Sequence, residues 1–492
     1  MGDHRPPAVW RSGRASWALA LVCGALAGLA LPPLGFPPLL WLALAGLWAL
    51  PPAAAVLWGG AAVLLSHGWL LWLHPLDWVG IPLPLSLPLC VCLLLACGAL
   101  GGLMVGAWRW SVEALGGAQM LSTALITAAL WGLGEVLLAQ GPLFWIGLGV
   151  AALPSDRALA GLAQLVGAGG LAALQLLLGW GLWRLLGGVR PPGPRWWRQA
   201  ALWTLLVLLL HALGWQRLLA ASGHQSEGEP IPLLVLQPDI PTRRKFEADQ
   251  QGRLLTLLAQ AQGQAERLGS RALLLPEGAL SLMQPLPRIS TVEVLSGGFR
   301  QENEELRSAL LAFPPGSREA SGFLDKHRLV PLGEWIPGAD LIRWSGLSAV
   351  GGLTAGSSSR LLPRPTGPLA VAICYEISDG HSLAAAVRQG AGWLLTSANL
   401  DPYPVQLKTQ FSALAQLRAI ESGRWLVSSA NTGPSLLVDA SGRVRQTLPL
   451  DRVGTLATAV RPRRGDTLYV HWGEAPLLML LGSGLLLRRL RR

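Results

Sequence analysis

An apolar segment runs directly into a cysteine, a tyrosine and a glutamate at residues 369–376. The pattern Leu-Ala-Val-Ala-Ile before Cys374, Tyr375 and Glu376 is typical of a buried strand that ends at a thiol. A strand end is a place where a fold can present a nucleophile. Inert packing is the alternative, because a free cysteine is among the residue types most often found buried.

Two charged residues stand beside other apolar segments. Residues 271–278 predict a short strand that ends at Glu277, and within residues 323–334 Lys326 stands in front of a third apolar strand. Either charge could instead be an ordinary solvated one. The lysine is nevertheless unusual, because the chain uses arginine almost everywhere and has lysine only at three positions: 245, 326 and 408.

A thiol, a carboxylate and an ammonium together could carry out nucleophilic catalysis. A thiol with a pKa of about 8.5 is only a few per cent thiolate at neutral pH, so it needs a base or a cationic neighbour. Glu277 could take the proton of Cys374. Lys326 could stabilise a developing oxyanion as a compact donor, for which the planar fork of arginine has the wrong shape. A helix beginning near Asp379 would add backbone amides at the turn after the thiol.

Long apolar segments place part of the chain in a membrane. The hydrophobic fraction is 51% and the mean hydropathy is +0.42. A span needs about 17 to 25 predominantly apolar residues. We predict seven spans before a long polar region and one after it, and we predict that the first span is not a removable signal peptide. The predicted spans are residues 15–31, 36–50, 53–73, 83–108, 120–138, 158–186, 199–220 and 474–488.

Arginines that flank these spans predict the orientation. They lie before the first span, between the sixth and seventh, and after the eighth: Arg5, Arg11, Arg14, Arg184, Arg190, Arg195, Arg198, Arg488, Arg489, Arg491 and Arg492. The positive-inside rule puts all three groups in the cytoplasm, so residues 221–471 lie outside it. Much of the net charge of +11 stands in these flanks, where it meets anionic lipid headgroups rather than nucleic acid.

Glu135 is an acidic residue inside a predicted span. A charge at the bilayer centre costs a few kcal/mol, about 3 on insertion scales. Glu135 should therefore lie near a span end, in a cavity, or paired. A structural role and a functional role remain equally open.

The cysteines and histidines predict neither a disulfide in the outside region nor a metal site. Only Cys374 of the five cysteines lies in that region, so no pair can form within it. The spacing of Cys90, Cys92 and Cys97 matches no metal site, and the eight histidines are scattered. We expect no metal and no cofactor.

The outside region alternates apolar strands with helical stretches, which is typical of an α/β domain. We predict helices over residues 246–268 and 412–421. The predicted strands are residues 233–236, 272–275, 369–373, 393–396, 425–428 and 436–438.

Three motifs resemble the nitrilase (carbon–nitrogen hydrolase) superfamily with its Glu-Lys-Cys triad: PEGA at 276–279, DKHRLVPLGEWIP at 325–337 and ICYE at 373–376. With the membrane segments, the chain resembles the bacterial apolipoprotein N-acyltransferase family. Residues 131–135 and 141–149 are similar to the membrane half of that family.

The resemblance implies both a fold and residue roles. The fold is a bundle of about eight transmembrane helices with an αββα sandwich. Glu277 would be the base, Lys326 the oxyanion-stabilising residue and Cys374 the nucleophile. Glu334 would support the site, although it could also be a surface charge. Tyr375 and Glu376 match the residues after the nucleophile, and we expect the Tyr375 N–H to be the second oxyanion donor.

Three departures from the family pattern lie in loops that would face the substrate. The usual Asn-Asp-x-Trp-Phe-Gly run is replaced by residues 399–403, Asn-Leu-Asp-Pro-Tyr. Phe246 stands where a substrate-binding tryptophan is expected, and Ser428 and Ser429 replace an arginine. These changes leave the triad intact and put the substrate detail in doubt.

The resemblance implies acyl transfer from a phospholipid, through a thioester on Cys374, to the α-amino group of a lipoprotein's N-terminal diacylglyceryl-cysteine. A membrane-tethered amidase is the alternative enzyme, and an inactive transporter or lipid-binding scaffold is the non-enzyme alternative. We expect a monomer in the bacterial inner membrane with its catalytic domain facing the periplasm. The expected domains are residues 1–220, 221–471 and 472–492.

Overall fold

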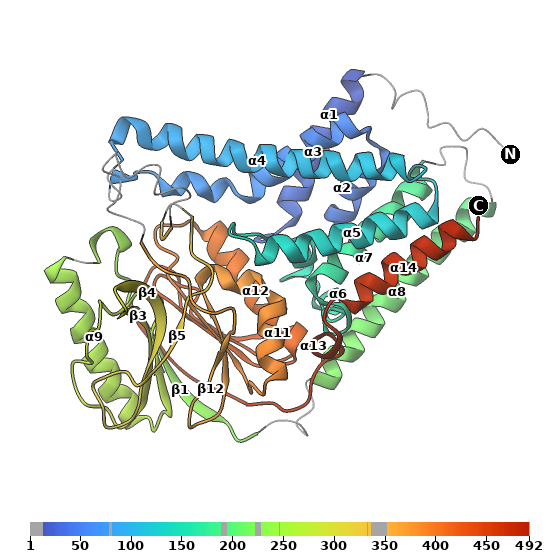
Figure 1. The fold of residues 1–492 in the computed structure, drawn as a ribbon. Helices are drawn as coiled ribbons and strands as arrows, with labels where there is room; N and C mark the ends of the chain where they lie inside the picture. Colours follow the sequence, from blue (N-terminus) through green and yellow to red (C-terminus); the bar gives the residue numbers. More distant parts are fainter. Residues whose placement is uncertain are drawn as a thin grey trace.

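The structure is a computed structural model that describes residues 13–77, 81–187, 194–221, 228–245, 247–331, 333–335 and 352–491. Phe246 lies outside the described residues. A helical part, built from the N-terminal half and the last helix, sits on an α/β part (Figure 1).

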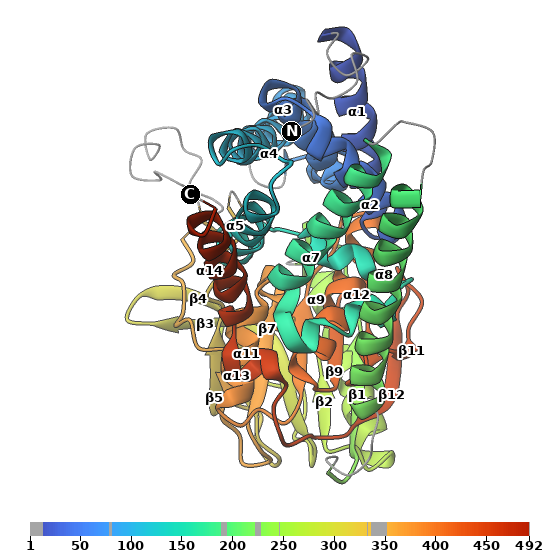
Figure 2. The ribbon, with the colours of Figure 1, turned by 90° about the vertical axis from the view of Figure 1, so that its right-hand side faces the viewer.

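The helical part brings the last helix back onto the N-terminal half of the chain. Its last helix, α14, packs on α5 and α7, although most of the sequence separates them (Figure 1). Figure 2 shows α8 running from the level of the helical part down to that of the α/β part. The elements are α1 (Gly13–Ala30), α2 (Pro37–Ala49), α3 (Pro52–Ser66), η2 (Gly68–Leu73), α4 (Leu83–Ala114), α5 (Leu121–Gln140), η4 (Leu148–Ala152), α6 (Arg157–Ala160), α7 (Ala163–Leu186), α8 (Pro194–Ala221) and α14 (Ala475–Arg489).

Five of these helices are long and apolar enough to cross a membrane: α1, α4, α5, α7 and α8. The helix α2 has 13 residues and α3 has 15. At 1.5 Å per residue, 13 residues reach only about 20 Å of a hydrocarbon core of about 30 Å. The predicted span 53–73 is divided between α3 and η2, and Gly167 (φ 66°) interrupts α7. The number of eight spans therefore stays a prediction.

Leucines cover the outer faces of these helices. On α8, Leu202, Leu205, Leu208 and Leu209 are about half exposed or more. Water would disfavour so large an apolar surface, whereas lipid tails accept it. The chain is a membrane protein.

In the described residues, the α/β part contains two six-stranded sheets, ordered β12-β1-β2-β3-β4-β5 and β11-β10-β9-β8-β7-β6. The strands are β1 (Ile231–Gln237), β2 (Ala272–Leu274), β3 (Glu293–Glu302), β4 (Glu305–Phe313), β5 (Gly322–Asp325), β6 (Leu361–Leu362), β7 (Leu369–Ile373), β8 (Leu394–Ala398), β9 (Leu426–Ala430), β10 (Leu436–Val438), β11 (Val444–Thr447) and β12 (Gly454–Val460). The helices and turns are η6 (Thr242–Arg244), α9 (Ala248–Arg267), η8 (Cys374–Ser378), α11 (Gly380–Arg388), α12 (Val405–Ser422) and α13 (Leu468–Trp472).

Alternate residues of β1 show how the layers pack. Leu233 and Val235 join the core between the two sheets, while Leu234 and Leu236 pack toward α9 on the outer face. On the far side, α11 and α12 cover the second sheet (Figure 1). The expected αββα sandwich is confirmed.

The six predicted strands are confirmed to within two residues at each end, but six others escaped prediction. The longest of these are β3 and β4, whose paired ends carry charges such as Arg300 and Arg307 instead of an apolar run. The prediction that Lys326 precedes a strand was wrong, because Lys326 directly follows β5. The helix predicted at 412–421 begins earlier, at Val405.

Candidate active site

Cys374 stands at a sharp turn between β7 and η8. All five residues of β7 are buried, and the chain reverses at Cys374 with φ at +54°. This left-handed conformation costs a residue with a side chain roughly 1–2 kcal/mol. Such strain at a strand end is one way in which enzymes aim a nucleophile. Cys374 is 5% exposed, and its thiol lies close enough to the Glu277 carboxyl group for that carboxylate to raise the thiol pKa beyond the effect of burial.

Glu277 and Lys326 meet across the first sheet. Lys326 Nζ donates to Glu277 Oε1 at 2.6 Å. Glu277 follows β2, and neighbouring β3 carries a glycine beside it. A Cβ atom on Gly297 would lie 2.4 Å from the Glu277 Cα, so only glycine leaves room for this approach.

Glu334 is the second carboxylate on the same ammonium. Lys326 Nζ donates to Glu334 Oε1 at 2.8 Å, and the Val330 N–H donates to Glu334 Oε2 at 2.8 Å. The lysine is 1% exposed. Two carboxylates, those of Glu277 and Glu334, therefore hold the Lys326 ammonium from two sides.

Burial and charge together decide the protonation states. Burial raises the pKa of the Cys374 thiol well above its ordinary value, and Glu277 raises it further. Burial disfavours the Lys326 ammonium, but Glu277 and Glu334 outweigh burial and raise its pKa. Burial also raises the pKa of Glu334, which Lys326 opposes. At neutral pH the thiol and the ammonium both carry their protons.

Glu376 lies in the turn that follows Cys374 and is held by several donors. Its carboxylate accepts from Arg360 at 2.8 Å to each oxygen, and from the backbone N–H groups of Ile373 at 2.8 Å and His327 at 2.7 Å. It is 2% exposed. Glu376 thus ties the end of β7 to the loop that carries Lys326.

Tyr375 connects the site to the helical part. Its ring centroid lies 5.0 Å from that of Phe144. Burial raises the pKa of its hydroxyl, and Tyr403 lies close enough to raise that pKa further. Tyr403 in turn lies 5.3 Å from Trp69 in an edge-to-face arrangement. Aromatic residues of both parts therefore form one wall beside Cys374.

Several functional neighbours were missed from the sequence. The backbone N–H of Asn399 donates to Glu277 Oε2 at 3.0 Å, and Arg360 holds Glu376. Lys245 lines a cavity that also contains Glu277, and burial lowers its pKa. Two signals were available: Asn399 begins the departing loop, and Lys245 is one of only three lysines.

Residues 292–467 match the carbon-nitrogen hydrolase profile. Together with the apolar helices, this match defines a membrane-bound enzyme of the carbon–nitrogen hydrolase class. The chain is 50% identical to an apolipoprotein N-acyltransferase of Prochlorococcus marinus (strain MIT 9313), over 94% of this chain and 95% of that relative. It is 45% identical to one of Parasynechococcus marenigrum (strain WH8102), over 95% and 98%. The chain therefore belongs to the apolipoprotein N-acyltransferase family, and it is an acyltransferase.

Among solved structures, Saccharomyces cerevisiae Nit3, a member of branch 10 of the nitrilase superfamily, aligns with 48% of this chain and 92% of its own. The sequence identity is 14% and the TM-score is 0.37.

Proposed function

We propose that Cys374 takes an acyl chain from a phospholipid as a thioester and passes it to the α-amino group of a lipoprotein's diacylglyceryl-cysteine. The observation that carries this proposal is the placement of Glu277, which accepts from the Lys326 ammonium at 2.6 Å and lies near enough to the Cys374 thiol to raise its pKa beyond the effect of burial. This arrangement suits transfer of a proton and stabilisation of an oxyanion in one place.

In the first half-reaction, Sγ of Cys374 attacks the ester carbonyl of the phospholipid while Glu277 takes the thiol proton. The carbonyl oxygen becomes an oxyanion, which the Tyr375 N–H and the Lys326 ammonium stabilise. The carbon–oxygen ester bond then breaks, and Glu277 returns the proton to the leaving alcohol. A lysophospholipid leaves, and the acyl group remains on Cys374.

In the second half-reaction, the acceptor's amine attacks the thioester carbonyl and Glu277 takes one of its protons. The carbon–sulfur bond breaks, an amide forms, and the thiol regains its proton from Glu277. Water must not reach the thioester in the interval. The aromatic wall of Phe144, Tyr375, Tyr403 and Trp69 supplies an apolar surface that disfavours water there.

We place this chemistry at the outer surface of the bacterial inner membrane. The membrane domain is residues 1–220, the periplasmic catalytic domain is residues 221–471, and residues 472–492 return to the cytoplasm. The arginines that flank the predicted spans support this orientation. Cysteine tags near Ser226 and His471 should react with a membrane-impermeant thiol reagent from the periplasm, and a cytoplasmic readout at Ser226 would contradict the topology.

Intact-protein mass measurement tests the function directly. The purified chain, incubated with phospholipid alone, should gain one acyl mass that hydroxylamine removes. Addition of a diacylglyceryl-cysteine peptide should then discharge the acyl group as an amide. Release of free fatty acid instead of amide would identify a membrane-tethered amidase. A single species in native mass spectra would support the expected monomer.

A further inference from the structure

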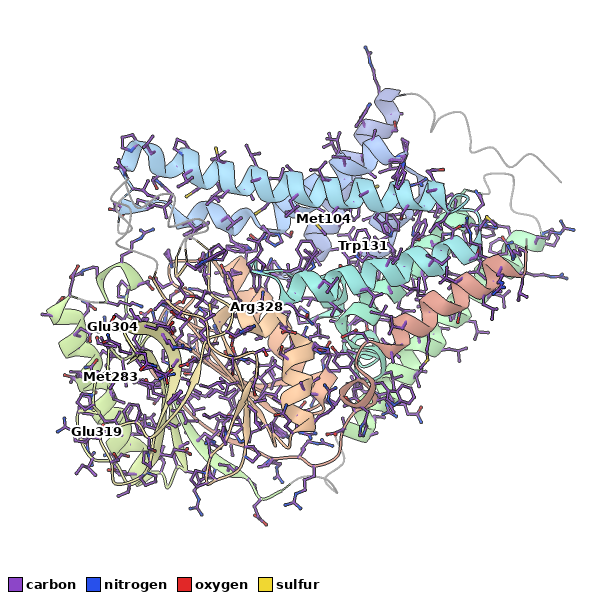
Figure 3. All side chains as sticks on the ribbon, viewed as in Figure 1. Met104, Trp131, Met283, Glu304, Glu319 and Arg328 are labelled. Atoms are coloured by element: carbon purple, nitrogen blue, oxygen red, sulfur yellow. The ribbon has the colours of Figure 1, made fainter. Side chains whose placement is uncertain are left out.

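Arg328 joins the helical part to the nucleophile turn. Its side chain is almost fully buried, at 7% exposure. Nε and Nη2 donate to the Gly141 carbonyl at 3.0 and 2.6 Å, and Nη2 also donates to Leu143 O at 3.2 Å. Nη1 donates to Tyr375 O at 3.0 Å and to Ser378 Oγ at 2.7 Å. Figure 3 places Arg328 at the level where the two parts meet.

The carbonyls on the helical side belong to the end of α5. Gly141 follows the last residue of α5, where carbonyl groups lack helical partners and carry partial negative charge. A guanidinium is well suited to that position. Ser378 reinforces the same junction, because its hydroxyl contacts Ala139 O at 3.2 Å and Tyr375 O at 2.9 Å.

The carbonyl on the catalytic side belongs to η8, the turn that begins at Cys374. The Tyr375 carbonyl is one peptide unit away from the Tyr375 N–H that we assign to the oxyanion. The two peptide units share the Tyr375 Cα, so a shift of this carbonyl that moves the Cα also displaces that N–H, and an oxyanion donor acts only within about 2.7–3.1 Å of the charge. Arg328 therefore holds the neighbour of a catalytic group without touching the substrate.

We propose that Arg328 is a positioning residue that sets the nucleophile turn against the end of α5, so that acylation depends on the contact between the two parts. This inference rests on the proposed acyl transfer through Cys374. Arginine is required because its planar fork donates in two opposite directions at once. A lysine keeps the charge but offers one compact donor group, which cannot reach both sets of carbonyls.

The test uses the full-length protein in phospholipid–detergent micelles, with acyl-enzyme formation followed by intact mass. We expect Arg328→Lys to lower the maximum acylation rate by roughly 10- to 100-fold, since a misplacement of about 1 Å can cost that much. The phospholipid concentration at half-maximum rate should change less than about threefold, because all three guanidinium nitrogens of buried Arg328 already donate to protein groups. If Arg328 had only a structural role, the substitution would lower the amount of folded protein, but the folded fraction would acylate at the rate of the unchanged chain.

Arg424→Lys is the matched control. Arg424 is also buried and donates to backbone carbonyls, at 3.0 Å to Ala391 and 2.7 Å to Gly465. It should lose comparable thermal stability and keep an acylation rate within about threefold of the unchanged chain. Equal acylation rates in the two variants would overturn the role proposed for Arg328.

Ser378→Ala keeps the inference testable if Arg328→Lys does not fold. Loss of this hydroxyl should reduce the acylation rate by roughly three- to tenfold, about one neutral hydrogen bond, and a rate equal to that of the unchanged chain would count against the inference. Where both variants fold, the double variant should be no slower than Arg328→Lys, whereas additive losses would mean that the two residues act separately.

The same assay separates failure of this inference from failure of the proposed function. If Cys374→Ala still gains the acyl mass, the thioester function is wrong and the role of Arg328 falls with it. If the unchanged chain acylates at Cys374 but Arg328→Lys behaves like Arg424→Lys, only the positioning role is wrong.

Discussion

Two buried glutamates, one in each part of the molecule, are held in different ways. In the helical part, Glu135 accepts from the Trp131 indole N–H at 2.8 Å and from the Leu148 N–H at 2.9 Å. In the sandwich, Glu277 accepts from the Lys326 ammonium at 2.6 Å and from the Asn399 N–H at 3.0 Å. Neutral donors surround the first carboxyl group, and a cation and a thiol flank the second.

The difference favours a structural role for Glu135 and suits the proton transfer that we propose for Glu277. Glu135 satisfies the backbone of the segment that returns from α5 to η4, which favours its structural interpretation. Glu277 has one oxygen on a cation and lies against a thiol, so a proton can move between thiol and carboxylate while the cation balances the charge. Burial alone would not have distinguished the two, since Glu135 is 6% exposed and the Glu277 side chain is 10% exposed.

Removal of the thiol should have the largest effect. Cys374→Ala should abolish the acyl mass gained from phospholipid, because no other group in the cluster can form the thioester. Cys374→Ser should be nearly as inactive, since a serine hydroxyl is a far weaker nucleophile. An acyl adduct of undiminished yield on Cys374→Ala, seen by intact mass, would refute the assigned nucleophile.

Glu277→Gln should slow acylation by roughly 10²–10⁴, the usual loss when a general base is removed. Glutamine keeps the shape of the side chain, so the effect reports proton transfer. Single-turnover acylation at saturating phospholipid measures it. A rate within about tenfold of the unchanged chain would mean that Glu277 only positions Lys326.

Lys326→Arg should lower the acylation rate by roughly 10²–10³, similar to the loss of one oxyanion donor. The charge remains, but the planar guanidinium cannot sit between Glu277 and Glu334 at 2.6 and 2.8 Å and still reach the oxyanion. The same single-turnover assay measures the change. Full activity of this variant would show that charge suffices and geometry does not matter.

The Cys374 thiol should titrate late. Because burial and then Glu277 raise its pKa, the thiol is neutral below that pKa and becomes a thiolate only as the pH rises through it. The difference in ultraviolet thiolate absorbance between the unchanged chain and Cys374→Ala should appear only above the ordinary value of about 8.5. A thiolate signal at neutral pH would contradict the proton transfer assigned to Glu277.

Glu135→Gln should have the smallest effect on chemistry. Its amide N–H₂ group would face a backbone or indole donor, and one unsatisfied buried group costs about 1–3 kcal/mol. We expect a lower unfolding temperature and an acylation rate within about tenfold. Glu319→Gln, at an exposed position, is the control for the charge change (Figure 3). It should alter neither the unfolding temperature nor the acylation rate. A large loss of acylation with unchanged stability would give Glu135 a functional role.

The sequence by itself indicated the chemistry that we propose and predicted the class of fold. Glu277, Lys326 and Cys374 stand in motifs that resemble the family's, which indicated the base, the cation and the nucleophile that we propose. Apolar runs such as residues 369–373 predict strands because neighbouring residues suffice to define them. The apolar windows likewise predicted that the chain enters a membrane. Local pattern failed at β3 and β4, where Gly297 and the charged ends conceal the strands.

Only the tertiary structure decided which groups touch. The Asn399 N–H reaches Glu277 across 122 positions, and Arg328 reaches Gly141 across 187. Such contacts depend on sheet register and on how α5 meets η8, and no short-range periodicity encodes either one. The same reason explains why the surroundings of Lys326 could not be predicted. Its neighbours in sequence indicated a polar loop, but Lys326 follows β5 and is buried between two carboxylates.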